Sequence, residues 1–159
     1  MNTEHFLAYV DGRQIRWRLA LEQCINEAGT DPRARLLAIF DALRSCAASQ
    51  QGLRSFSFTH AITELAGPQD PVRAMVTTHK ETLRQQMLEL SEATGTPDPD
   101  LLTDQLLLVY EGAIANHAFG NVDNATDKAH TTARQLIAAA SPLPLNTFLV
   151  DRDPESPLP

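Results

Sequence analysis

The sequence predicts an all-α fold of about six helices, and two observations carry this prediction. Apolar residues recur at three- and four-residue spacing along most of the 159-residue chain. The dipeptide Asp-Pro occurs four times, and the copies that begin at Asp31, Asp70 and Asp98 stand directly before such runs. An aspartate can accept hydrogen bonds from the free N–H groups of a helix start, and proline loses no bond in the first turn. The three dipeptides therefore mark predicted helix starts, and we find no convincing strand hairpin.

The first helix is expected from about Glu4 to Glu27, where it carries one apolar stripe that only Gln14 interrupts. That stripe consists of Leu7, Val10, Trp17, Leu21, Cys24 and Ala28. Gly29 is suited to the helix stop. The second helix starts at Asp31 and ends before Gln50, and its inward residues are Leu36, Leu37, Phe40, Leu43 and Ala47.

A short third helix is expected over about Ser57 to Leu65, because Gly67-Pro68 closes that segment. The fourth opens at Asp70 and breaks at Gly95-Thr96-Pro97. Its apolar side consists of Val72, Met75, Val76, His79, Leu83, Met87 and Leu90. The sixth helix is expected over about 122–140. Five of the ten prolines follow residue 141, so residues 141–159 are predicted to be an extended or disordered tail to a single domain, residues 1–140.

The fifth helix, expected over about Pro99 to Phe119, differs because it has two apolar faces. One consists of Leu102, Leu106, Val109, Gly112, Ala113 and Asn116, and the other of Leu107, Tyr110, Ile114 and Ala118. A helix that is apolar on two sides is buried on two sides, so one face is expected to meet another chain. Gly112 supports this expectation, because a glycine inside a helix costs about 1 kcal/mol unless close packing compensates.

Composition and the absence of known motifs disfavour several classes of function. The net charge of −7 disfavours contact with phosphate backbones. Two cysteines, no basic apolar leader and no long apolar run indicate a cytoplasmic chain without a membrane span. The sequence has no G-x-S-x-G, no H-E-x-x-H, no phosphate loop and no cysteine with an adjacent histidine, so we expect no enzyme and no cofactor.

Four stretches resemble the C-terminal, effector-binding and dimerisation domain of the tetracycline-repressor (TetR) family of bacterial regulators. The first two stretches are similar to the family's long connecting helix (FLAYVDGRQIRWRLALE, 6–22) and to the helix that follows it (DPRARLLAIFDAL, 31–43). The third is similar to a motif that often reads Gly-Cys-Pro-Phe-x-Asn-Ala (SFSFTHAITEL, 55–65). The fourth is similar to the family's dimerisation helix (DQLLLVYEGAIANHAF, 104–119). Ser55, Phe56, Ser57 and His60 depart from the third motif, and Glu111 replaces the usual Asp.

The resemblance implies a transcription regulator's sensing domain that forms a homodimer through a four-helix bundle and binds a small apolar or aromatic effector. The family's helix-turn-helix is absent from these 159 residues, so we expect no operator binding from this polypeptide alone. The missing module also suggests an alternative function. The chain would then be an interaction protein that heterodimerises with full-length regulators and titrates them.

The candidate effector site combines residues from the first, second, fourth and fifth helices with the third motif. Its predicted members are Trp17, Phe40, Phe58, His60, Met75, His79, Tyr110 and Glu111. Most of these side chains could instead simply fill the core. His79 is either a satisfied core residue or a polar anchor for the ligand. His60 and Glu64 share one helical face, but a metal needs three or four ligands, so no metal is expected.

Glu111 must be paired or exposed, and Tyr110 of another helix, Arg134 or a ligand amine are its open partners. The predicted dimer interface follows from the first apolar face of the fifth helix and from the sixth helix. Its members are Leu102, Leu106, Val109, Gly112, Ala113, Asn116, Ala133, Arg134 and Ile137.

Overall fold

The computed structural model describes residues 3–49, 53 and 66–141. Within these ranges, every regular element is an α-helix: α1 (Thr3–Glu27), α2 (Pro32–Ala48), α4 (Pro71–Ala93), α5 (Pro99–Phe119) and α6 (Ala125–Ala140). The all-α prediction is therefore confirmed for this part of the chain. The predicted third helix, 57–65, and the Pro-rich segment 142–159 lie outside the described residues.

The Asp-Pro dipeptides begin three of these helices, as predicted. In α2, α4 and α5 the aspartate is the N-cap and the proline follows at the first helical position. The carboxylates accept backbone N–H bonds at 2.9–3.0 Å, namely Asp31 from Arg33, Asp70 from Val72 and Asp98 from Leu101. The caps satisfy donors that have no partner inside the helix, so the boundaries are fixed by local chemistry.

The start of α6 differs from the prediction. The turn between α5 and α6 contains two left-handed residues, Gly120 with φ 66° and Asn124 with φ 53°. Gly120 closes α5 by donating its N–H to the carbonyl of Asn116 at 3.0 Å. Asn124 is the N-cap of α6, so Val122 precedes the helix and does not belong to it. Spacing alone placed Val122 in the helix because an apolar residue in a turn can extend a periodic pattern by chance.

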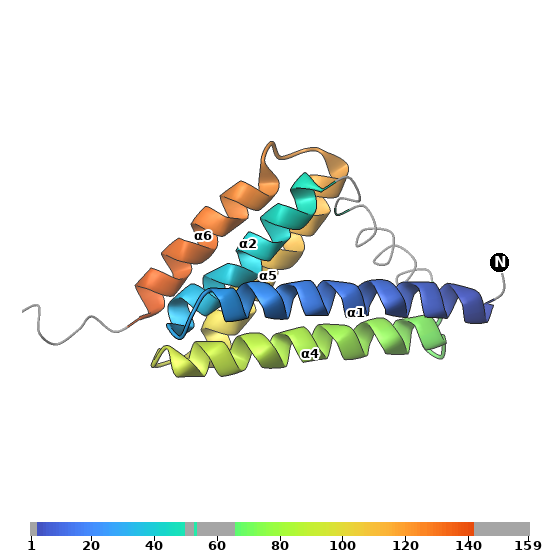
Figure 1. Ribbon diagram of the computed structural model, residues 1–159, viewed down its shortest axis with the longest axis horizontal. Coiled ribbons are helices and arrows are strands. Elements are labelled where there is room, and N and C mark those ends of the chain that lie inside the picture. Colours follow the sequence, from blue (N-terminus) through green and yellow to red (C-terminus); the bar gives the residue numbers. More distant parts are fainter. Residues whose placement is uncertain (1–2, 50–52, 54–65, 142–159) are drawn as a thin grey trace, which may run out of the picture.

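The helices form two groups that cross each other (Figure 1). The long helices α1 and α4 run beside each other, and α2, α5 and α6 are inclined to them. α2 is central, since it packs against α1, α4 and α6, while α5 packs against α4 and α6. Phe40, Leu36, Ile39 and Leu43 of α2 are fully buried. No helix in the described part of the chain has the length and apolar character needed to cross a membrane.

Candidate functional site

Three of the predicted site residues meet where α1, α2 and α5 come together. Trp17 of α1 donates its indole N–H to the hydroxyl of Tyr110 on α5, with 3.0 Å between Nε1 and the oxygen. The ring of Phe40 on α2 stands edge-on to the Tyr110 ring, with 6.3 Å between centroids and 83° between planes. Edge-to-face packing of this kind suits the aromatic quadrupoles. Residues far apart in the sequence thus form one aromatic cluster, which consists of Trp17, Phe40 and Tyr110.

The hydroxyl of Tyr110 uses only part of its hydrogen-bonding capacity. The residue is 3% exposed and its oxygen accepts the bond from Trp17. Among the residues that the structure describes, none offers an acceptor within hydrogen-bonding distance of the Tyr110 O–H. A buried donor without an acceptor costs free energy. This O–H is therefore a group that an incoming oxygen or nitrogen atom would satisfy.

Burial raises the pKa of Tyr110 well above its ordinary value. The hydrogen bond from Trp17 lowers this pKa in part, whereas the charges of Glu111 and Cys46 raise it further. The folded state therefore holds the tyrosine proton at a pH where the unfolded chain, with a pKa of about 10, has released it. The native state consequently binds more protons than the unfolded state above that pH. The free energy of unfolding must fall as the pH rises beyond it.

Replacing Tyr110 by phenylalanine is expected to remove this alkaline loss of stability. Between pH 10 and 11 the wild-type free energy of unfolding should fall by up to about 1.4 kcal/mol more than that of Tyr110→Phe. Urea unfolding monitored by far-UV circular dichroism at several pH values measures the difference. Tyr9→Phe is the matched control, because Tyr9 is 49% exposed and its loss should leave the wild-type slope unchanged. Equal slopes for Tyr110→Phe and wild type would contradict the burial effect.

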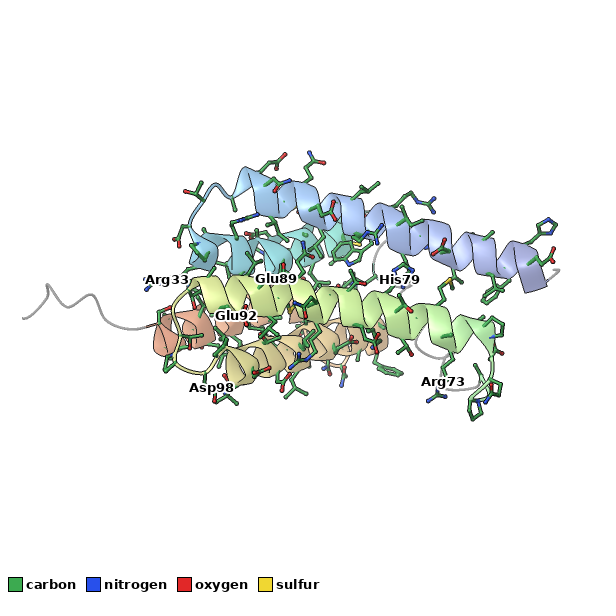
Figure 2. The ribbon with its side chains drawn as sticks, turned by 90° about the horizontal axis from the view of Figure 1, so that it is seen from below. Arg33, Arg73, His79, Glu89, Glu92 and Asp98 are labelled. Carbon is green, nitrogen blue, oxygen red and sulfur yellow. The ribbon has the colours of Figure 1, made fainter. Side chains whose placement is uncertain are left out.

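The other predicted site residues are not part of this cluster. His79 on α4 lies 3.2 Å from Asp11 on α1, measured from Nε2 to Oδ1, and Figure 2 shows it between these two helices. Its ring therefore has a partner, as the core-residue interpretation requires. Met75 is half-buried one turn earlier on α4. Phe58 and His60 lie outside the described residues, as does Glu64.

Glu111 is half-buried and pairs with a residue that the sequence analysis did not consider. Its Oε1 atom lies 2.8 Å from Nζ of Lys80 on α4. Pairing is thus one of the two outcomes that the sequence left open for this carboxylate, and Arg134 stands exposed on α6. The sequence analysis did not predict Lys80 as this partner, because it considered only the apolar side of the fourth helix.

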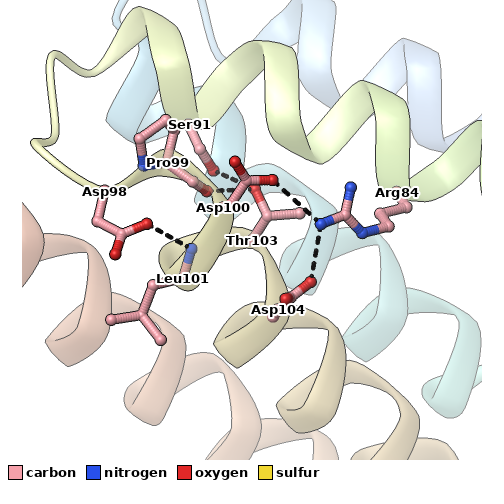
Figure 3. Close-up of polar contacts among 8 residues, drawn as sticks. All are labelled: Arg84, Ser91, Asp98, Pro99, Asp100, Leu101, Thr103 and Asp104. Carbon is pink, nitrogen blue, oxygen red and sulfur yellow. Dashed lines mark hydrogen bonds and ion pairs between the residues drawn. The ribbon is translucent and has the colours of Figure 1, made fainter.

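A second polar group connects the start of α5 to α4 (Figure 3). Arg84 binds Asp100 at 3.3 Å and Asp104 at 3.0 Å. The hydrogen bonds that Arg84 donates to these carboxylates, the one to Asp104 first, raise the pKa of its guanidinium further. Beneath them, the hydroxyl of Thr103 lies 3.1 Å from that of Ser91, and both residues are fully buried. The hydroxyl oxygen of Thr103 also lies 2.7 Å from the carbonyl oxygen of Pro99, one helical turn earlier.

Polar side chains also link α2 to α6, and the sequence analysis predicted none of these contacts. Arg44 binds Asp127 at 2.7 Å and lies 3.6 Å from Asp41, while His130 lies 3.0 Å from Asp41. Such exposed pairs contribute little individually to stability, typically about 0–1 kcal/mol. They do identify the side of α6 that faces α2.

The cysteines and acidic residues provide little reactive chemistry. Cys24 and Cys46 form no disulfide, and burial raises the pKa of both thiols, so both are protonated at neutral pH. Within residues 3–49, 53 and 66–141, no three side chains from His, Cys, Asp and Glu come together in a way that could hold a metal ion.

Five members of the predicted dimer interface lie in the core of the single chain. Their side chains are at most 5% exposed: Leu102, Leu106, Ala113, Ala133 and Ile137. The reason is that α5 already packs against both α4 and α6, so its two apolar faces are covered by its own chain. Of the other four, Val109, Gly112 and Asn116 are partly exposed and Arg134 is exposed.

The exposed stripe of α5 differs from the predicted dimer interface, because only Gly112 belongs to both. Leu101, Leu108 and Phe119 are 53%, 76% and 84% exposed, and Ala115 is exposed as well. With the partly exposed Gln105 and Gly112 they recur at alternating four- and three-residue intervals. We call these six residues the α5 stripe: Leu101, Gln105, Leu108, Gly112, Ala115 and Phe119.

Comparison with known proteins finds no relative of this chain. No protein-family model matches the chain, and no curated protein or solved structure matches it either.

Proposed function

We propose that this chain is the small-molecule-sensing and dimerisation domain of a transcription regulator similar to those of the TetR family, working as a cytoplasmic homodimer. The effector is an apolar or aromatic compound that presents a hydrogen-bond acceptor to Tyr110. The proposal assigns no DNA contact to the described helices. What carries it is the buried O–H of Tyr110, which has no acceptor among the described residues and lies beside Trp17 and Phe40.

The position of the aromatic cluster supports a sensing role. Its three residues belong to α1, α2 and α5, so an oxygen atom that accepts from Tyr110 would lie where these helices meet. A ligand shifts a conformational equilibrium only when it binds one arrangement better than another. An effector at this junction would favour one angle of α1 relative to α5. In an intact regulator, such a change would alter the spacing of the DNA-reading modules.

The test is a thermal-shift screen with apolar and aromatic compounds, each paired with an analogue that lacks the acceptor oxygen. Trp17 is the only tryptophan, so its fluorescence reports directly on binding near the cluster. We expect hits only among compounds with the acceptor. Tyr110→Phe should weaken their binding roughly 3- to 10-fold, because one hydrogen bond contributes about 0.5–1.5 kcal/mol.

Tyr9→Phe is the control for that titration, since it removes the same hydroxyl from an exposed site. Its affinity should equal that of the wild type. A screen in which no compound raises the melting temperature would contradict sensing. Hits that bind Tyr110→Phe as tightly as wild type would contradict the assigned contact.

The exposed α5 stripe supports the alternative function, in which the chain binds a full-length regulator. A chain that exposes an uncharged helix surface could pair with a full-length regulator and titrate it. Native mass spectrometry of this chain mixed with an intact regulator that carries a similar helix would detect heterodimers. Homodimers alone would contradict the alternative.

A further inference from the structure

The surroundings of the Tyr110 hydroxyl oppose negative charge. Tyr110 is 3% exposed, so an ion placed beside its oxygen would lose most of its hydration. The described residues place no lysine or arginine nitrogen within hydrogen-bonding distance of that oxygen, and its partner there is the uncharged indole of Trp17. Phe40 adds an aromatic ring. None of these contacts would compensate an anion for the loss of water.

Glu111 adds a negative charge next to this hydroxyl. It follows Tyr110 directly on α5, and its Oε1 atom lies 2.8 Å from Nζ of Lys80. Burial raises the pKa of Tyr110 most, and the charge of Glu111 raises it further although Lys80 is bound to this carboxylate. The phenolate of a tyrosine is itself an anionic oxygen. A ligand anion at the same place would therefore be opposed by the same burial and the same charge.

We infer that the effector presents an uncharged carbonyl oxygen to Tyr110, as ketones and esters do, and that Glu111 determines this choice by repelling carboxylates. The inference rests on the proposed function, since it takes the Tyr110 hydroxyl as the effector contact. It adds the chemical class of the effector and one specificity-determining residue.

The hydrogen-bonding capacity of the site favours a carbonyl over other uncharged groups. The O–H of Tyr110 requires an acceptor, and a ketone or ester oxygen accepts without bringing a hydrogen of its own. An alcohol or a primary amide would bring an O–H or N–H group, and a buried donor without an acceptor costs free energy. A protonated amine would be attracted by Glu111, but it has no lone pair with which to accept the bond.

The first experiment compares matched compounds by isothermal titration calorimetry. Acetophenone, benzoate and α-methylstyrene have nearly the same shape and carry a carbonyl, a carboxylate and no acceptor, respectively. The same three groups are also tested on naphthalene and cyclohexane rings, so that ring size is varied separately from charge. At neutral pH a ketone should bind roughly 30-fold or more tightly than its carboxylate, because the carboxylate would be buried without a cation.

The pH dependence of binding gives a second reading from the same compounds. The carboxylic acid should bind only in its neutral form, so its affinity should fall about tenfold for each pH unit above its own pKa. The affinity of the ketone should stay constant over the same range, which controls for titration of the protein.

The second experiment changes the charge near the site while preserving the shape. Glu111→Gln should shrink the preference for ketone over carboxylate roughly 2- to 5-fold, because a partly exposed charge is screened by water. Lys80→Met removes the partner cation and should enlarge that preference by a similar factor. Glu92→Gln, the same amidation at an exposed position of α4, is the control and should leave the preference unchanged. Far-UV circular dichroism checks that each variant is folded.

A carboxylate that binds as tightly as its ketone at neutral pH would overturn the chemical class. A preference that is the same in Glu111→Gln, Lys80→Met and wild type would overturn the role of Glu111. Both outcomes leave the sensing role intact, since compounds still bind. If no compound on any ring binds, the proposed function itself is contradicted and the inference fails with it.

Discussion

Phe40→Ala should lower the free energy of unfolding by about 3–5 kcal/mol, the range observed when large aromatic side chains are removed from a core. Phe40 is fully buried on the central helix α2, and its ring packs edge-on against Tyr110. Truncation would leave a cavity beside the aromatic cluster and remove the edge-to-face contact. Urea unfolding followed by the fluorescence of Trp17, at one fixed protein concentration, measures the loss.

Phe40→Leu is the graded control for this experiment, because leucine keeps most of the apolar volume. It should cost clearly less, on the order of 1 kcal/mol. A loss below about 1 kcal/mol for Phe40→Ala would show that the site can close around the missing ring, or that Phe40 is not closely packed.

Ala133→Leu should lower the free energy of unfolding by about 1–3 kcal/mol, the usual effect of adding methylene groups to a packed interior. Ala133 is fully buried on α6, a helix that packs against both α2 and α5. A leucine there would force the helices apart. Thermal and urea unfolding measure the effect, and sedimentation shows whether the proposed dimer is also affected.

Ala138→Leu is the matched control, since it is the same substitution on the exposed side of the same helix. It should change the free energy of unfolding by less than about 0.5 kcal/mol. If Ala133→Leu left the monomer fully stable and only abolished dimerisation, Ala133 would have to be an interface residue, as the sequence suggested.

Local signals in the sequence predicted the helices well. The Asp-Pro dipeptides placed the starts of α2, α4 and α5, because capping is a contact between residues two or three positions apart. α5 ends at Phe119, as the spacing predicted, and the structure shows that the left-handed Gly120 closes it. Val122 was the error, because its apolar side chain matched the helical spacing although α6 begins only after the N-cap Asn124.

The candidate site was predicted only in part. Trp17, Phe40 and Tyr110 do meet, because each lies on the inward side of its own helix and the helices pack together. The partners of Glu111 and His79 were not foreseen. Lys80 and Asp11 lie on other helices, and spacing within one helix does not show which neighbour it will face.

The sequence by itself determined that the described part of this chain is helical and where most of its described helices begin and end. These properties depend on contacts within one or two helical turns. Only the tertiary structure decided that both apolar faces of α5 are covered by α4 and α6, which moved Leu106 into the core and left Leu108 exposed. Two residues apart on a helix point to nearly opposite sides, so the face that remains free depends on how the neighbouring helices pack.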